Sequence, residues 1–186
     1  MTTYVLGGGC FWCVDAVFRR LKGVTEVASG YAGGSVESPS YYQVSSEKTG
    51  HAEVVKVTFD ETILPANELL DLFFLIHDPT TLNRQGADVG TQYRSVMLYA
   101  DKGQKSAFEA AVERAKTHWD DPIVTEIKPL ETFYKAEGEH QDYFNKNPAA
   151  GYCQIVIIPK IVKARQAYKK LFKDRGTSQG ALRFAD

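Results

Sequence analysis

Apolar and polar residues follow two different periods along this chain. Alternation every second residue, with valine, isoleucine and aromatic side chains, predicts strands at 3–6, 24–29, 52–59, 94–100, 123–130 and 154–158. Apolar residues three and four apart predict helices at 11–22, 65–78, 101–119, 138–147 and 160–173. Gly23, Pro65, Pro79 and Asp101 stand at helix ends, where such residues stop or cap helices. This mixture predicts a two-layer α+β domain.

Length favours a single catalytic domain over residues 1–186, in which about 160–186 form a C-terminal helix and tail. The polar segment after Gly176 is expected to fray. With 22 basic and 23 acidic residues the net charge is −1, which argues against nucleic acid or a membrane surface as partner. The start does not resemble a signal peptide and no apolar run could span a bilayer, so we expect a cytoplasmic protein.

Three cysteines in a reducing compartment indicate catalysis or metal binding more than a disulfide framework. The segment GGGCFWC places Cys10 between a glycine turn and a helix, where free N–H groups and the helix dipole would stabilise a thiolate. Phe11 and Trp12 point about 100° apart on that helix, so one of them should be half exposed beside Cys10 and form a wall for an apolar group. A small buried cysteine is the alternative for Cys10.

Glu53 begins the more apolar face of the strand at 52–59, which it shares with Val55, Val57 and Phe59. A carboxyl group in that place is partly desolvated, so its pKa rises and it becomes a proton donor near neutral pH. If the strand end frays, Glu53 simply reaches water.

Two loops add polar side chains to this set. Residues 78–95 are too long for an ordinary connection and carry Asp78, Arg84, Gln85, Asp88, Gln92 and Tyr93. SPSYYQV, residues 38–44, adds Tyr41 after a turn, and phenols can hydrogen-bond an oxygen that gains charge. A flexible surface loop and packed tyrosines are the simpler interpretations.

Zinc is the main chemical alternative. His51 and Glu53 in HAE, together with CFWC, share elements with zinc deaminases. Here the order is reversed, Gly9 replaces a proline, and Cys153 is isolated, so no second cysteine pair completes a site. A site that only binds peptides is a further alternative, in which replacing Cys10 would have no effect.

Several motifs in order resemble one family, the peptide methionine sulfoxide reductases of the A type. They are GCFWC, GYAGG, GHAEVVKV, HDPTT, RQGADVGTQYRS, EHQDYFNKNP and GYC, spread from residue 9 to 153. With this resemblance we expect a mixed sheet with flanking helices, a ferredoxin-like core, and repair of oxidised proteins by reduction of the S epimer of methionine sulfoxide.

The resemblance implies a role for each site residue. Cys10 attacks the sulfoxide sulfur, Phe11 and Trp12 hold the S-methyl group, and Glu53 protonates the oxygen. Tyr41 and Tyr93 hydrogen-bond that oxygen, and Asp88 is a further carboxylate of the site.

Cys10 would become a sulfenic acid, a second thiol would form a disulfide with it, and thioredoxin would reduce that disulfide without a metal or organic cofactor. Cys153 matches the family's recycling position and is favoured as this second thiol. Cys13 stands where many members have glycine, and the cysteine that many carry after GYC is lacking here. Cys13 is the alternative, although it also fits as a small residue that packs under the helix.

Overall fold

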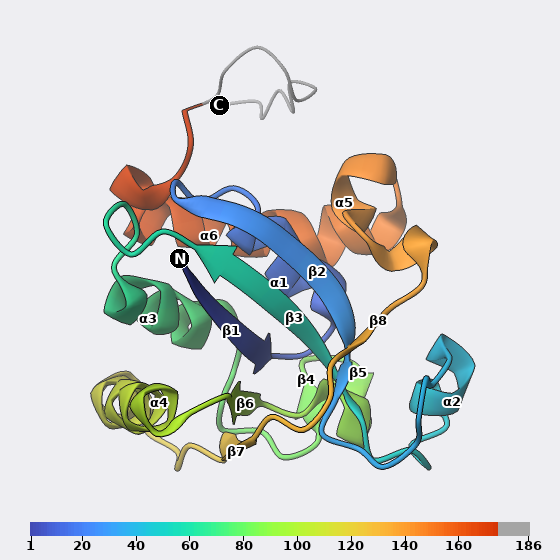
Figure 1. Cartoon of the computed structure of the whole chain (residues 1–186). Helices are drawn as coiled ribbons and strands as arrows, with labels where there is room; N and C mark the ends of the chain where they lie inside the picture. Colours follow the sequence, from blue (N-terminus) through green and yellow to red (C-terminus); the bar gives the residue numbers. More distant parts are fainter. Residues whose placement is uncertain (175–186) are drawn as a thin grey trace.

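A computed structural model describes residues 1–174 as a six-stranded sheet with helices packed on one face (Figure 1). The strand order is β7-β6-β1-β3-β2-β8, and only β6 and β7 run parallel. Strands β6, β1, β3 and β2 form an antiparallel unit in which α1 connects β1 to β2 and α3 follows β3. This is the split βαβ arrangement of a ferredoxin-like core, so the predicted mixed α+β sheet is confirmed.

The strands of the main sheet are β1 (Thr2–Gly7), β2 (Val24–Ala32), β3 (Ala52–Phe59), β6 (Val96–Tyr99), β7 (Glu126–Pro129) and β8 (Tyr134–Lys135). A separate hairpin is formed by β4 (Arg84–Gln85) and β5 (Asp88–Val89). The segment 78–95 is therefore structured, and Tyr93 ends a short 3₁₀ turn, η1 (Thr91–Tyr93).

The helices are α1 (Phe11–Phe18), α2 (Tyr41–Ser45), α3 (Ala66–Ile76), α4 (Lys102–Ala115), α5 (Tyr143–Lys146) and α6 (Ile158–Ala167). Shorter turns are η2 (Lys116–His118), η3 (Gly138–His140) and η5 (Lys169–Leu171), and η4 (Cys153–Ile157) is a π-helix. Asp101 caps α4, since its carboxylate accepts a hydrogen bond from the Gln104 N–H at 2.9 Å. Pro65 precedes α3 as predicted.

The core lies between the sheet and the helices. Val55, Val57 and Phe59 of β3 face α1, whereas Ala52 and Val54 belong to a smaller cluster on the opposite face. On that opposite face, Leu130 and Phe133 pack against the smaller cluster. The predicted two faces of this strand are confirmed, and Glu53 therefore lies on the helix side.

Helix α1 is buried on nearly all sides, with only Trp12 partly exposed. Full burial of a side chain such as Val17 or Phe18 contributes about 1.5–3 kcal/mol, which fixes the helix firmly on the sheet. The helix ends at Phe18, before the expected boundary, because Leu21 forms a β-bridge with Phe172.

The predicted strand at 154–158 is wrong. These residues belong to the π-helix η4 and to the first residue of α6, into which η4 leads directly. β-Branched residues favour strands in isolation, but packing decides here: Cys153 and Ile157 are buried while Ile155 between them is exposed. Within residues 1–174, no helix is long and apolar enough to cross a membrane. The segment after Gly176 lies outside the described residues.

Candidate active site

Cys10 is the N-cap residue of α1, at the point where β1 turns into the helix. The turn needs glycine at two positions. A Cβ on Gly8 would lie 3.0 Å from the His77 ring, and Gly9 has φ +89° with a Cβ position 2.6 Å from Gln85 Cγ. Gln85 is itself fixed by hydrogen bonds to both backbone groups of Asp78. The glycine turn thus packs closely enough to hold the Cys10 sulfur in one place.

The His77 ring packs against this glycine turn, next to Gly8. Its Nδ1 donates to the Phe73 carbonyl at 2.6 Å, and its Nε2 lies 2.8 Å from the Ser95 hydroxyl. Burial lowers the pKa of His77 to about 4, so the ring is neutral at pH 7. This histidine was not among the sequence-predicted residues, although HDPTT contains it.

Glu53 lies on β3, beside the start of α1, and is 2% exposed. Its Oε2 accepts a 3.0 Å hydrogen bond from the Phe11 N–H. Burial raises the pKa of Glu53 to about 8; the nearby charges of Asp88 and Cys13 add to this shift, and the Phe11 hydrogen bond opposes it. The carboxyl group is therefore largely protonated at pH 7 and can donate a proton.

The electrostatics of Cys10 differ from the sequence-based expectation. Burial raises the pKa of the Cys10 thiol, and the Cys13 side chain and the Glu53 charge raise it further. The first free N–H of α1 is used by Glu53, so the helix terminus stabilises the carboxylate as well as a thiolate. Protonation of Glu53 removes one negative charge beside Cys10 and thereby favours the Cys10 thiolate.

Aromatic rings line the site next to Cys10. Phe11 is buried and Trp12 is partly exposed, as predicted. Trp12 stacks on Tyr143 with ring centres 3.7 Å apart and planes 7° apart, and its indole N–H donates to His140 Nδ1 at 3.3 Å. The His140 ring also stacks on Tyr41, with centres 4.5 Å apart. These rings form an apolar wall from four separate segments.

Tyr41 lies in α2 and Tyr93 in η1, and the charge of Glu53 acts on both phenols. The pKa of each phenol is raised, first by burial and then by the charge of Glu53, and the charge of Cys10 contributes to both. Both tyrosines therefore lie within electrostatic reach of the two central residues. Their pKa values stay above the usual range, so both phenols keep their protons and can donate hydrogen bonds at neutral pH.

Asp88 is connected to the cysteines through a residue that sequence reasoning missed. The Tyr152 hydroxyl donates to Asp88 Oδ2 at 2.7 Å and lies 3.6 Å from Cys13 Sγ. Burial and the charges of both Cys10 and Cys13 raise the pKa of Tyr152. Tyr152 lies within the GYC motif, so the sequence motif pointed to this position. Its contacts with Asp88 and Cys13 depend on the fold and could not be read from the sequence.

Glu137 was also missed. It accepts hydrogen bonds from the Tyr31 hydroxyl at 3.0 Å and from the Tyr41 N–H at 3.2 Å, and so fixes the start of α2 beside the site. His140 Nε2 is buried without a hydrogen-bond partner and lies 4.0 Å from Glu137 Oε2. A substrate polar group is a suitable partner for this nitrogen.

Some predicted residues have structural contacts instead. His51 uses both ring nitrogens for backbone groups, at 3.0 Å to Gly34 N and 2.7 Å to Val36 O. Arg84 is exposed and donates to the Gly86 carbonyl. Over residues 1–174, no three His, Cys, Asp or Glu side chains are grouped as a metal site.

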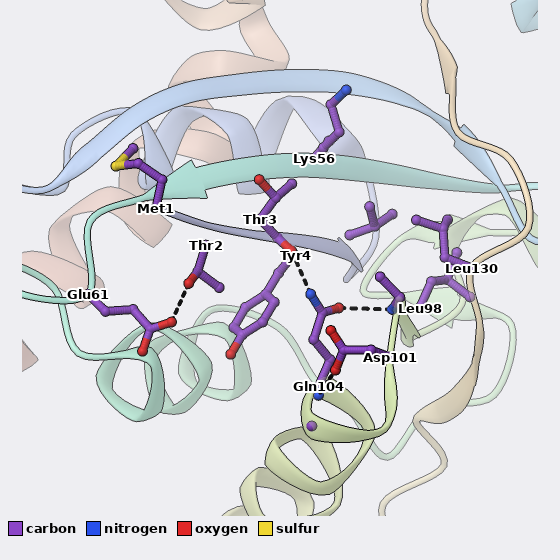
Figure 2. A pocket seen from close by; sticks show the side chains of 13 residues that line it. Met1, Thr2, Thr3, Tyr4, Lys56, Glu61, Leu98, Asp101, Gln104 and Leu130 are labelled. Carbon is purple, nitrogen blue, oxygen red and sulfur yellow. Dashed lines mark hydrogen bonds between the residues drawn. The ribbon is translucent and has the colours of Figure 1, made fainter.

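A hollow of about 570 Å³ lies elsewhere, between β1, β6 and the start of α4 (Figure 2). Gln104 bridges its wall by donating to Thr3 O and accepting from Ala100 N, both at 3.0 Å, and Thr2 contacts Glu61 at its rim. None of the predicted site residues lines it. The chemistry is therefore concentrated around Cys10 and Glu53.

Known proteins similar to this chain share most of its length. A family model described as peptide methionine sulfoxide reductase matches residues 2–172. The curated peptide methionine sulfoxide reductase MsrA of Paenarthrobacter aurescens (strain TC1) is 60% identical over 168 residues, covering 90% of this chain and 97% of the relative. Reduced Mxr1 from Saccharomyces cerevisiae superposes with a TM-score of 0.76 at 35% identity, covering 82% of this chain and 88% of that one. Mxr1 in complex with Trx2 superposes with a TM-score of 0.53 at 26% identity, covering 76% and 84%.

Proposed function

The chain belongs to the peptide methionine sulfoxide reductases of the A type, enzymes that reduce methionine sulfoxide, and we propose that it reduces the S epimer with Cys10 as nucleophile. The observation that carries this proposal is that Phe11, the residue after Cys10, donates its N–H to the carboxyl group of Glu53, whose raised pKa keeps it largely protonated at pH 7. A nucleophile and an acid side by side are what reduction of a sulfoxide requires.

Substrate binding comes first. Phe11 and the Trp12–Tyr143 stack offer an apolar wall for the S-methyl group of methionine sulfoxide. The wall begins one residue after Cys10, so a methyl group held there places the sulfoxide sulfur next to the thiolate.

In the chemical step the Cys10 thiolate attacks the sulfoxide sulfur while Glu53 gives its proton to the oxygen. Tyr41 and Tyr93 donate hydrogen bonds to this oxygen as it gains negative charge. Asp88 orients Tyr152 beside the cysteines. Methionine leaves as the sulfide, and the oxygen stays on Cys10 as a sulfenic acid, so one thiolate, one sulfoxide and one proton are consumed.

The Cys10 thiol is regenerated by reaction with other thiols. A second cysteine, Cys153 or Cys13, condenses with the sulfenic acid, releasing water and forming a disulfide. We propose thioredoxin as the reductant of that disulfide, supported by the solved complex of yeast Mxr1 with Trx2. This route needs no metal or organic cofactor.

Residues 1–186 are proposed to act as one catalytic domain, since one core cluster contains residues from Tyr4 to Phe172. The cytoplasm is the proposed compartment, because all three cysteines are free thiols and a reducing environment keeps them so. Repair of oxidised proteins is the proposed role.

The test is steady-state reduction of the separated S and R epimers of methionine sulfoxide, with dithiothreitol as reductant. Wild type is expected to reduce the S epimer only, and Cys10→Ser is expected to reduce neither. Zinc content is measured on the same samples. Turnover that survives in Cys10→Ser, or stoichiometric zinc without turnover, would overturn the proposal.

A further inference from the structure

The apolar wall of the site depends on a short segment, residues 136–147, that lies outside α1. His140 accepts the Trp12 indole N–H at 3.3 Å, and Tyr143 stacks on the same indole with ring centres 3.7 Å apart. The segment forms only η3 and the short helix α5, so regular secondary structure does little to fix its place. Two polar side chains of its motif EHQDYFNKNP have no part in the proposed chemistry, and both contact other elements of the fold.

We propose that these two, Gln141 and Asn145, are positioning residues that hold the segment, and with it the apolar wall, in place for the S-methyl group of the substrate. This inference rests on the proposed function, because it needs the wall to bind that group. Neither side chain needs to touch the substrate, since both act through His140 and Tyr143.

Gln141 holds the segment against β2. Its Oε1 accepts the Ser29 N–H at 2.9 Å, and its Nε2 donates to the Ser29 carbonyl at 2.8 Å and to the Ala136 carbonyl at 2.9 Å. The β2–β8 ladder stops short of Ser29, so the side-chain amide pairs the Ser29 N–H that the ladder leaves free. Ser29 is fully buried, and an unpaired N–H there would be costly. These bonds fix Gln141, and thereby His140 next to it in the chain.

Asp142 turns the chain between His140 and Tyr143. Its backbone is left-handed, with φ 52°, a conformation that Asp and Asn adopt more readily than other non-glycine residues. Its carboxylate accepts a hydrogen bond from Asn145 Nδ2 at 2.7 Å and lies 3.5 Å from Arg19 Nε. The turn brings both rings to the same indole, and Asn145 holds the turn.

Asn145 also joins the segment to α1. Its Oδ1 accepts a hydrogen bond from Arg20 Nη2 at 2.8 Å, and Arg20 Nη1 donates to the Ala16 carbonyl of α1 at 2.7 Å. The Arg20 guanidinium lies over the ring of the buried Phe144, 4.8 Å from its centre. Because Cys10 is the N-cap of α1, one helix places both the nucleophile and the wall.

Loss of either anchor would free the rings of the segment while Cys10 and Glu53 keep their own positions at the start of α1. The wall contacts the methyl group in the bound substrate as well as during the reaction, so loosening it raises KM more than it lowers kcat. Trp12 would also lose its ring partners, which makes its indole more accessible to solvent.

The experiment compares Gln141→Met and Asn145→Ala with the otherwise unchanged chain, all carrying Trp119→Phe so that Trp12 is the one tryptophan left. Methionine is about as long as glutamine but has no amide group. KM and kcat for S-methionine sulfoxide are measured with dithiothreitol as reductant. Acrylamide quenching of Trp12 fluorescence is measured without substrate, and circular dichroism confirms that each variant is folded.

Gln104→Met in the same background is the matched control. The Gln104 amide likewise bridges two backbone groups, Thr3 O and Ala100 N, but it lies at the hollow of Figure 2, away from the site. A general loss of stability would therefore affect this control as well, whereas a change in the wall would not.

We expect Gln141→Met to raise KM by about tenfold with a smaller change in kcat, and to increase the quenching of Trp12. Asn145→Ala should change both quantities in the same direction, and decides the question alone if Gln141→Met does not fold. Gln104→Met should keep the KM and the quenching of its parent.

Folded anchor variants with the KM and the quenching of their parent would overturn the proposal, as would the same changes in Gln104→Met. The quenching measurement needs no turnover, so it tests the anchors independently of the reaction. Absence of S-epimer reduction by the parent would instead mean that the proposed function itself is wrong.

Discussion

The Phe11 backbone N–H donates a 3.0 Å hydrogen bond to Oε2 of Glu53, which joins the start of α1 to β3. Cys10 precedes Phe11, so a single turn of chain positions both the nucleophile and the carboxyl group. The hydrogen bond limits the rise in the pKa of Glu53 that burial causes, and leaves it at about 8, close to the working pH of a general acid.

Replacement of Glu53 by glutamine is expected to lower kcat/KM for S-methionine sulfoxide by about 10²–10⁴-fold, because the amide cannot supply the proton. Steady-state assays with dithiothreitol measure this loss. Glu131→Gln, at an exposed position, serves as the control and should behave as wild type. Activity of Glu53→Gln within a few-fold of wild type would remove Glu53 from the mechanism.

The same substitution is expected to stabilise the fold. The folded-state pKa of Glu53 is about 8 against a usual 4.5, so the contribution of Glu53 to stability is complete below pH 4.5 and is lost as pH rises toward 8. Glutamine has no such loss, and the gain at pH 7 is on the order of 3 kcal/mol at most. Urea unfolding of both proteins at pH 4.5 and pH 7 tests this, and equal differences at the two pH values would contradict it.

Activity should fall on the alkaline side. Above pH about 8 the Glu53 carboxyl group loses its proton while Cys10, whose pKa is raised further, still gains thiolate, so kcat/KM of the wild type is expected to level off near pH 8 and to drop about tenfold per pH unit once Cys10 is ionised. The Glu53→Gln variant should lack this decline in its residual activity. The same decline in that variant would assign the titration to another group.

Tyr41 and Tyr93 are expected to matter through their hydroxyl groups. Phenylalanine at either position should lower kcat by about 10–10³-fold with less effect on KM, since the hydrogen bond strengthens as charge develops on the oxygen. Tyr42 is 86% exposed next to Tyr41, so Tyr42→Phe is a matched control that should leave kcat unchanged. Equal effects of all three substitutions would argue against a specific role for the two hydroxyls.

The titration of His77 should make the stability of the fold depend on pH in the acidic range. Its folded-state pKa of about 4 lies below the usual 6.5, so its contribution is complete above pH 6.5 and is lost as pH falls toward 4. The His77→Gln variant is expected to lose less stability over this range, by roughly 3 kcal/mol at most. Thermal unfolding at several pH values measures this, with His118→Gln at an exposed position as control. A variant that follows the wild-type pH dependence would contradict the assignment.

The regular spacing of apolar residues predicted those helices and strands in which one face is buried. The strand at 52–59 was predicted at the observed bounds of β3, and the helix at 65–78 contains α3, because each has a clear apolar face. The prediction failed at 154–158, where a run of β-branched residues favours a strand in isolation. There the neighbouring helix α6 and burial of Cys153 and Ile157 determine the structure.

The residues of the candidate site were likewise predicted only in part. Cys10 and Glu53 were found because their local positions, a helix start and an apolar strand face, already define their surroundings. Tyr152, Glu137 and His140 were missed because their partners are more than 60 residues away in the chain. The direction of the Cys10 pKa also depended on the fold, since burial, the Cys13 side chain and the Glu53 charge all raise it.

The most direct test of the central claim is a single turnover by the Cys13→Ser/Cys153→Ser variant, in which Cys10 is the one cysteine left. One equivalent of S-methionine sulfoxide without reductant is predicted to give about one methionine per protein and a dimedone adduct on Cys10. Release of methionine with Cys10 unmodified, or no methionine from a variant shown to be folded, would contradict Cys10 as the nucleophile.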